Sequence, residues 1–186
     1  MNLTVLTPPA EEPVSVATAK QHLRVDHSND DALLAIYLQT ARELGEGLAR
    51  RAFVTQTLQL VIDTWPADGK VKLPRPPLQS VASVTYLDSD GDEHEWTDFD
   101  VDDRSEPGVL MFNSTPSANL FESGAIAIDF VAGYGAAAAV PKMFVTGILQ
   151  TVAHWYENRE AALPVNLTEI PLGYKPLFMA DRGWWF

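Results

Sequence analysis

Two segments with a strong helical period lie far apart in this chain, and a long stretch with a strand pattern separates them. In residues 30–51 the apolar side chains, Leu34 and Leu38 among them, recur every three to four positions, which predicts an amphipathic helix. The same period around Ile148 predicts a second amphipathic helix over residues 141–159. Each apolar stripe needs a partner, so we expect the two helices to pack together and the strand region to form an insertion.

Smaller signals refine the helical part. Residues 14–23 predict a short helix with Ser15 as its N-cap. Gly45 and Gly47 lie inside the first long helix, where each costs about 1 kcal/mol relative to alanine. Either another helix crosses closely at that point or the helix bends there. We expect the close crossing, and Gly147 in the second long helix points to the same close packing.

The region between the helices has the pattern of short strands. β-Branched and aromatic residues gather in runs separated by turn residues, which favours a small antiparallel sheet, sandwich or barrel. The runs cover residues 55–62, 81–87, 95–99, 109–112 and 125–131. The predicted fold class is α+β: a helical base of two long helices and a short N-terminal one, an inserted antiparallel β domain and an extended C-terminal tail. The expected division is 1–62 and 136–170 for the base, 63–135 for the β domain and 171–186 for the tail.

The turn Asp88-Ser89-Asp90-Gly91-Asp92 offers the main candidate for metal chemistry. Alternating carboxylates resemble the start of an EF-hand loop, but glycine stands fourth instead of sixth and Phe99 occupies the twelfth position. Asp90-Gly91 between strand-like flanks predicts the tip of a β-hairpin instead. We expect no metal site and no cofactor.

The remaining chemistry is sparse. The 186 residues include no cysteine, and the four histidines share no metal-ligand spacing. No serine lies in a nucleophile elbow, so we expect no enzyme. Ten acidic residues between Asp88 and Glu106 face one arginine, which indicates a solvated edge that resists aggregation. A carbohydrate- or calcium-binding β module, or a hydrolase that uses these acids, is the alternative.

Charge and hydropathy bound the partners. The net charge is −12 and the sequence pI is near 4.6, with no basic cluster to hold phosphates, so we expect no tight binding of DNA. The N-terminal residues lack the pattern of a signal peptide. The longest apolar stretch, residues 131–140, is too short for a bilayer. These features predict a soluble cytoplasmic chain with no membrane contact.

The C-terminal end is rich in large apolar side chains. A surface of that extent usually marks an interface, so we expect the tail to dock onto a partner or a neighbouring subunit. Docking of the chain end into its own domain is the alternative. The residues predicted for this contact are Leu172, Tyr174, Leu177, Phe178, Trp184, Trp185 and Phe186.

Several stretches resemble the gp6-like family of phage head–tail connector (adaptor) proteins, in particular its longer phiE125 gp8-like branch. The likeness covers most of the chain in the right order, with PRPPLQSV, AGYG and AHWYENRE as its most specific pieces. The matching residues are 13–26, 30–63, 73–91, 130–135 and 140–160.

The resemblance implies a non-enzymatic part of a virion, made in the host cytoplasm and located at the head–tail junction. Such adaptors form a ring, typically twelvefold, below the portal protein and extend the DNA channel toward a tail-side connector or tail terminator protein. DNA passes through without specific binding. The resemblance places subunit contacts on the two long helices, where the candidates are Tyr37, Arg42, Arg50, Arg51, His154 and Tyr156. A tail-side completion protein of the virion is the alternative within this class.

Overall fold

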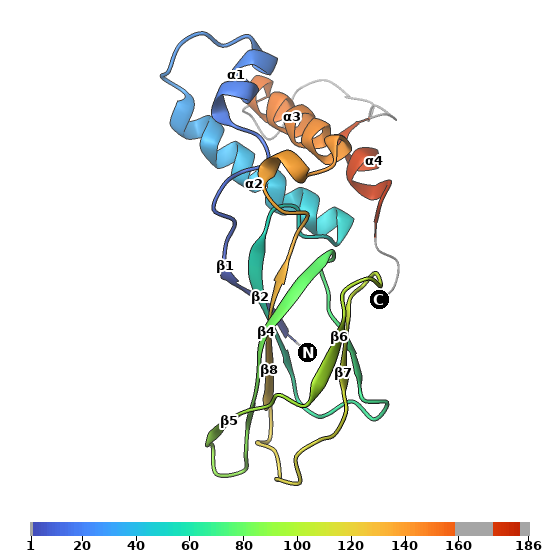
Figure 1. The fold of residues 1–186 in the computed structure, drawn as a ribbon. Coiled ribbons are helices and arrows are strands. Elements are labelled where there is room, and N and C mark those ends of the chain that lie inside the picture. The colour runs from blue at the N-terminus through green and yellow to red at the C-terminus, as the bar shows by residue number, and fades with distance from the viewer. Residues whose placement is uncertain (1, 159–172, 183–186) are drawn as a thin grey trace. The chain divides into compact units, whose positions relative to one another are not determined.

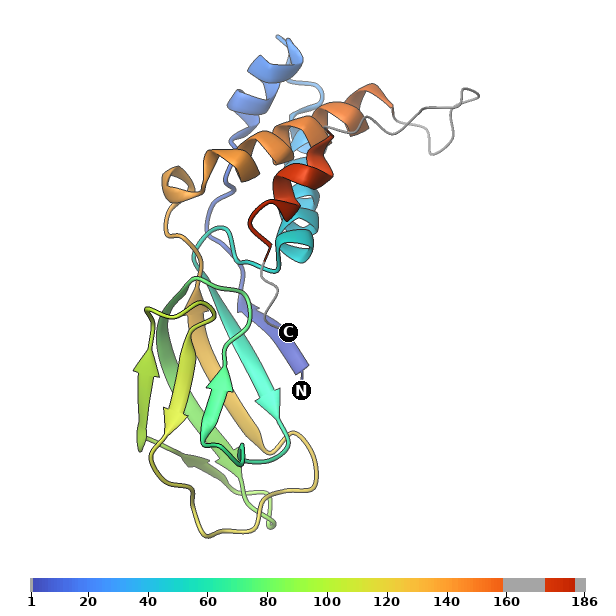
Figure 2. The ribbon, with the colours of Figure 1, turned by 90° about the vertical axis from the view of Figure 1, so that its right-hand side faces the viewer.

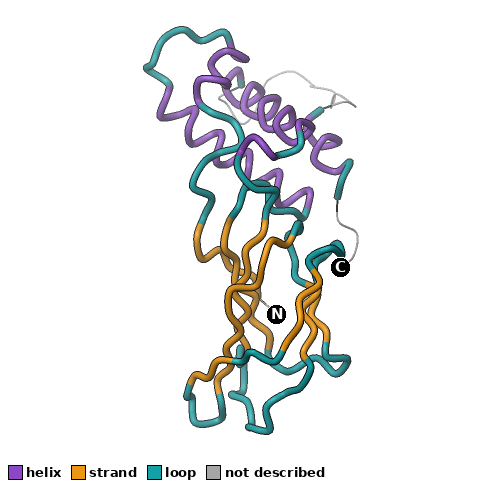
Figure 3. The backbone as a smooth tube through the Cα atoms, viewed as in Figure 1, coloured by secondary structure: helices purple, strands orange, loops and turns teal. Residues whose placement is uncertain are grey.

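A computed structural model describes residues 2–158 and 173–182 of the chain. The described residues form two compact units. The sheet unit contains residues 2–10 and 55–134, and the helical unit contains residues 11–54, 135–158 and 173–182. Figure 3 shows that the helices belong to one unit and the strands to the other.

The helical unit is built on the two long amphipathic helices that the sequence predicts. Helix α2 (Asp31–Ala49) packs against α3 (Lys142–Glu157), and both contact the short C-terminal helix α4 (Tyr174–Met179). Helix α1 (Val16–Leu23) contacts α2 and α3, and the 3-10 helix η1 (Ala137–Ala139) precedes α3 (Figure 1). The buried stripe of α2 includes Leu34 and Leu38, and that of α3 includes Ile148, as the period predicts.

Local signals explain where the helices begin and end. Ser15 is the N-cap of α1, and its hydroxyl accepts a hydrogen bond from the backbone N–H of Thr18 at 3.1 Å, as predicted. Helices α1 and α2 both end at an arginine in the left-handed conformation, Arg24 (φ 58°) and Arg50 (φ 55°). Each is a C-terminal stop of the kind usually made by glycine.

The sheet unit contains two antiparallel sheets. The five-stranded sheet has the order β1-β2-β8-β4-β5, and the three-stranded sheet has the order β3-β7-β6 (Figure 2). The strands are β1 (Asn2–Thr7), β2 (Gln56–Ile62), β3 (Lys70–Lys72), β4 (Leu78–Leu87), β5 (Glu93–Glu95), β6 (Phe99–Asp102), β7 (Val109–Phe112) and β8 (Ile126–Ala132).

The core of the sheet unit follows from strand alternation. Every second residue of β2 and of β8 is buried, and the register pairs Leu58 with Phe130 and Leu60 with Ile128. An aromatic group extends this core: Trp65 lies edge-on to Phe112, with ring centroids 4.9 Å apart, and also contacts Tyr86 and Trp96.

The structure confirms the α+β fold class, with helical elements and a small antiparallel β domain. It also adds strands β1 and β3, which the sequence patterns did not indicate. Residues 2–10 and 55–62 lie in the sheet unit, whereas the expected division placed residues 1–62 in the helical base. The reason is strand pairing: β1 and β2 are hydrogen-bonded neighbours, so β2 cannot be separated from the sheet.

Candidate interaction surface

Helix α4 is held in the helical unit by one aromatic side chain. Phe178 is fully buried, and a Cβ added at Gly45 of α2 or at Gly147 of α3 would lie 2.6 or 2.9 Å from its ring. Phe53 contacts the same ring, with centroids 6.2 Å apart, and stacks on Phe144 at 4.4 Å. The two glycines thus make the space that Phe178 fills.

The prediction of close packing at the helix glycines is therefore confirmed for Gly45 and Gly147. At Gly47 it is wrong within the described part of the chain, because a Cβ there would have nothing within 4 Å. The difference comes from helix geometry, since residues two positions apart face different sides of a helix.

An ion pair adds to the attachment of α4. The guanidinium of Arg51 donates to the backbone carbonyl of Asp181 at 2.8 Å and to its carboxylate at 3.2 Å. The Arg51 side chain is only 5% exposed, so this contact lies at the edge of the core. The carbonyl bond ties the end of α4 to the loop that follows α2.

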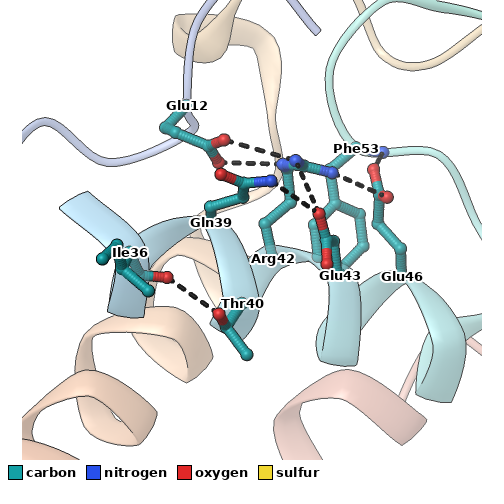
Figure 4. Close-up of polar contacts among 8 residues, drawn as sticks. All are labelled: Glu12, Ile36, Gln39, Thr40, Arg42, Glu43, Glu46 and Phe53. Carbon is teal, nitrogen blue, oxygen red and sulfur yellow. Dashed lines mark hydrogen bonds and ion pairs between the residues drawn. The ribbon is translucent and has the colours of Figure 1, made fainter. Parts of the chain in front are cut away.

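A second arginine, Arg42, forms a cluster of ion pairs beside the loop that follows α2 (Figure 4). Arg42 on α2 binds the carboxylate of Glu12 at 2.8 Å and that of Glu46 at 3.2 Å, and Glu43 lies 3.6 Å away. Glu46 also accepts the backbone N–H of Phe53 at 2.8 Å. Burial lowers the pKa of Arg42, but the hydrogen bond to Glu12 and the charges of Glu46, Glu12 and Glu43 outweigh it, so the pKa is raised.

The opposite side of α2 presents a stripe that no described residue covers. Ala32, Ile36, Thr40, Leu44 and Gly47 follow one another at intervals of three or four residues, and all are exposed. The exposed fractions are 61% for Ile36 and 36% for Leu44. The hydroxyl of Thr40 donates to the carbonyl of Ile36, so this stripe is largely apolar (Figure 4).

The predicted docking residues have different positions. Phe178 is a correction: its side chain fills a socket in its own helical unit and is not available to a partner. Tyr174 and Leu177 are half-buried on α4, and Met179 is 38% exposed beside them. Leu172, Trp184, Trp185 and Phe186 lie outside the described residues.

The residues predicted for subunit contacts also differ in their surroundings: some are buried in contacts within the chain and others are exposed. Arg42 and Arg51 are corrected, because both guanidinium groups are buried in intramolecular ion pairs. Tyr156 donates its hydroxyl to Asp30 at 2.6 Å, and Tyr37 packs edge-on against Trp155 at 5.8 Å. Arg50 is half-buried at the end of α2, and His154 is exposed on α3. The exposed stripe of α2 is not among the residues predicted from the sequence, although its spacing of three and four residues is a signal that the sequence carries.

The turn at Asp88 is a β-hairpin between β4 and β5, as predicted. The carboxylate of Asp88 accepts the backbone N–H groups of Asp90 and Asp92 at 3.0 Å and contacts His94 Nε2 at 2.7 Å. The hydrogen bond to His94 and the backbone bonds lower the pKa of Asp88. Within residues 2–158 and 173–182 no three histidine or acidic side chains gather as metal ligands.

No helix of the described residues combines the length and the apolar character that crossing a membrane requires.

The fold is similar to that of chains in structures of gene transfer agent particles and their necks. A chain from the neck of an empty gene transfer agent particle, computed with C6 symmetry, matches with a TM-score of 0.80 and 24% identity. A chain from the virion of a native gene transfer agent particle matches at 0.79 and 23%, and one from the neck of the native particle, computed with C12 symmetry, at 0.78 and 24%. Each alignment covers 98% of this chain and 95% of the other.

A comparison of the sequence with protein-family models finds a match to one family. The model of the phage gp6-like head–tail connector protein family matches residues 13–90, which confirms the resemblance predicted from the sequence. The matched residues include α1, α2 and the strands from β2 to β4. No curated protein matches the chain.

Proposed function

We propose that this chain is a structural, non-enzymatic head–tail connector (adaptor) of a tailed phage or phage-like particle. The observation that carries the proposal is the likeness to a neck protein over nearly the whole of both chains. The connector-family pattern in residues 13–90 supports the same role independently of the three-dimensional comparison.

In this role the chain forms a ring at the head–tail junction. The similar neck structures were computed with sixfold and twelvefold symmetry, which favours a ring of repeated copies here. A closed ring needs two different complementary surfaces on each subunit. The exposed apolar stripe of α2 supplies one of them, because Ile36 and Leu44 have no cover within the described residues.

The ring joins the portal protein on its head side to a tail-side connector or tail terminator protein, and DNA passes through it without specific binding. The net charge of −12 fits a channel that does not retain DNA, because like charges repel the phosphates. The C-terminal residues beyond α4 supply the contact with the portal protein.

Deletion of the gene in the particle-producing cells tests the role. We expect filled heads and free tails that do not join, and normal particles when the gene is restored. Electron microscopy of the lysates distinguishes the outcomes. Normal joined particles from the deletion strain would refute a connector role.

A short truncation tests the docking of the C-terminal residues. Deleting residues 183–186 leaves α4 and Phe178 in place, so we expect an unchanged circular dichroism spectrum but no attachment to the portal ring. Phe178→Ala is the matched comparison: it should lower the free energy of unfolding by about 3–5 kcal/mol, because it empties a buried site. Normal portal attachment by the truncated chain would contradict this part of the proposal.

A further inference from the structure

Among the described residues, no strand pairs with either outer edge of the three-stranded sheet, and the two edges carry opposite charges. β7 lies in its centre, with β3 on one side and β6 on the other. β3 carries Lys70 and Lys72, and β6 carries Asp100 and Asp102. The side chains of Lys70, Lys72 and Asp100 have no ion pair or hydrogen bond with any described residue.

The backbone pattern fixes what each edge offers. Leu73 N–H donates to Gly108, and Phe112 N–H donates to Gly69, so odd-numbered residues of β3 bond to β7. The backbone groups of Lys70 and Lys72 therefore point away from β7. The Lys70 N–H donates to the Asp68 carboxylate at 3.2 Å.

On β6 the even-numbered residues, and not the odd-numbered ones, bond to β7. Asn113 N–H donates to the carbonyl of Asp98, so even-numbered residues of β6 bond to β7. The backbone groups of Val101 and the carbonyl of Phe99 therefore point away from β7, whereas the Phe99 N–H donates to the Thr97 carbonyl at 3.1 Å. Asp100 lies between Phe99 and Val101, and Asp102 follows Val101.

From this geometry we propose that β3 of one subunit pairs with β6 of a second copy, in parallel, so that the three-stranded sheet continues from subunit to subunit around the ring. The inference rests on the proposed function, since a pair of three- and four-residue edges is too small to hold a complex alone and needs the wider subunit contact. It goes beyond that function by giving the strand pair, its direction and its register.

The direction and the register of the proposed strand pair follow from which residues of β3 and β6 face away from β7. β3 and β6 are both antiparallel to β7, so they are parallel to each other. When the sheet continues head to tail into the next copy, β6 and the neighbouring β3 therefore run in the same direction. In a parallel pair, an outward-facing residue lies opposite an inward-facing one and bonds to the neighbours of that residue. Lys70 then lies opposite Asp100, and Lys72 lies opposite Asp102. The new bonds are Lys72 N–H to the Val101 carbonyl, Val101 N–H to the Lys70 carbonyl, and Asp103 N–H to the Lys72 carbonyl.

The side chains agree with this register on both faces of the sheet. Lys70 and Asp100 are both registered with Met111, so they share one face, where opposite charges meet. Val71 and Val101 are both registered with Leu110 on the other face. Val71 and Leu110 are buried, whereas Val101 is 38% exposed at its edge, so a neighbouring strand would extend the apolar layer to it.

Charge also selects this arrangement against the symmetric ones. Two β3 edges would bring lysines together, and two β6 edges would bring aspartates together, which disfavours a two-fold dimer through either edge. The unlike edges favour a head-to-tail contact, which is the kind that closes into a ring.

Paired cysteines test the contact, because the natural chain has none. Particles are prepared with the full-length Lys70→Cys/Asp100→Cys variant and oxidised gently. Neighbouring strands lie about 4.8 Å apart, which is within the range of Cα···Cα distances that a disulfide can bridge. We expect a ladder of covalent multimers on a non-reducing gel, extending to the complete ring.

Two controls keep the result specific. Each single-cysteine variant can give dimers at most. Lys70→Cys/Glu95→Cys places the second thiol on β5, an exposed acidic edge of the other sheet, and should give no ladder. A charge exchange adds an independent readout: Asp100→Lys alone should reduce the yield of joined particles, and Lys70→Asp/Asp100→Lys should restore it.

The outcomes separate this contact from the proposed function. Particles that contain the double-cysteine chain but give no ladder above the control overturn the strand pairing and leave the connector role intact. Absence of the natural chain from purified particles overturns the connector role, and the strand pairing falls with it. A ladder from the β5 control as strong as that from the β6 variant also overturns the pairing.

Discussion

Gly45 and Gly47 of α2 lie two positions apart and have opposite surroundings. A Cβ at residue 45 would meet the rings of Phe178 and Phe53 at 2.6 and 2.9 Å, whereas a Cβ at residue 47 would meet nothing within 4 Å. The sequence assigns the same cost to both glycines. Only the packing shows that the first is required by its own unit.

The two alanine variants form a matched pair. Gly45→Ala should destabilise the protein by about 1–3 kcal/mol, because the ring of Phe178 has no room to move. Gly47→Ala should stabilise it by up to about 1 kcal/mol, because alanine is the better helix former. Urea unfolding measures both, and equal effects would contradict the socket described for Phe178.

Arg42 neutralises a cluster of three carboxylates, those of Glu12, Glu43 and Glu46, so its removal should destabilise the folded protein. Its removal leaves Glu46, whose side chain is 5% exposed, without its guanidinium partner. We expect Arg42→Ala to lower the free energy of unfolding by about 3–5 kcal/mol. Glu43→Ala is the control, since that side chain is 56% exposed and 3.6 Å away, and its effect should stay below about 1 kcal/mol. A small effect of Arg42→Ala in chemical denaturation would show that Glu46 needs no counter-charge.

At the scale of the element, the β4–β5 hairpin shows how far local sequence reaches. Asp90-Gly91 between strand-like flanks was sufficient to predict the turn, because a positive φ at glycine is a local requirement, met here by Gly91 at 89°. The contact of Asp88 with His94 joins the two sides of the hairpin across the turn. That contact depends on strand pairing and was not readable from either residue alone.

The Asp88 contacts predict a pH dependence. Because the pKa of Asp88 is lowered in the folded protein, its stabilising contribution is present above the ordinary aspartate pKa. The contribution is lost as the pH falls through the lowered value. Asp88→Asn should therefore be less stable than the natural chain at pH 6, and the difference should shrink below about pH 3. Denaturation of both proteins across this range tests the sign; a difference that grows toward acid pH would contradict it.

Helix α4, unlike the β4–β5 hairpin, could not be understood from its local sequence. Its sequence looked like a docking segment because apolar side chains gather there, and composition does not reveal which partner covers them. The structure divides the segment: Phe178 faces its own unit, while Met179 remains exposed. The socket is made by Gly45 and Gly147, which are about a hundred positions apart in the sequence, so no local pattern could identify it.

For the whole molecule, strand β1 decides how the chain is divided. β1 comes from residues 2–7 but pairs with β2 (Gln56–Ile62). The sheet unit is therefore completed by a segment that residues 11–54 of the helical unit separate from the rest of the sheet in the sequence. A fragment of residues 55–134 would leave β2 as an unprotected edge.

We expect that fragment to associate or aggregate on its own, because open hydrophobic edges pair with other chains. Joining residues 2–10 to it through a flexible linker should restore a monomeric sheet unit. Size-exclusion chromatography with light scattering distinguishes the two fragments. A monomeric, folded 55–134 fragment would show that β1 is dispensable.

The periodic elements follow from the order of the amino acids alone: the two long helices, the main strands, the hairpin turn and the α+β class. They do so because helical period, strand alternation and turn chemistry are local properties of neighbouring residues. The burial of Phe178, the ion pairs of Arg42 and Arg51, and the pairing of β1 with β2 become apparent only in the folded chain. These contacts join residues far apart in the chain, and the packing that selects among possible partners exists only when the fold is complete.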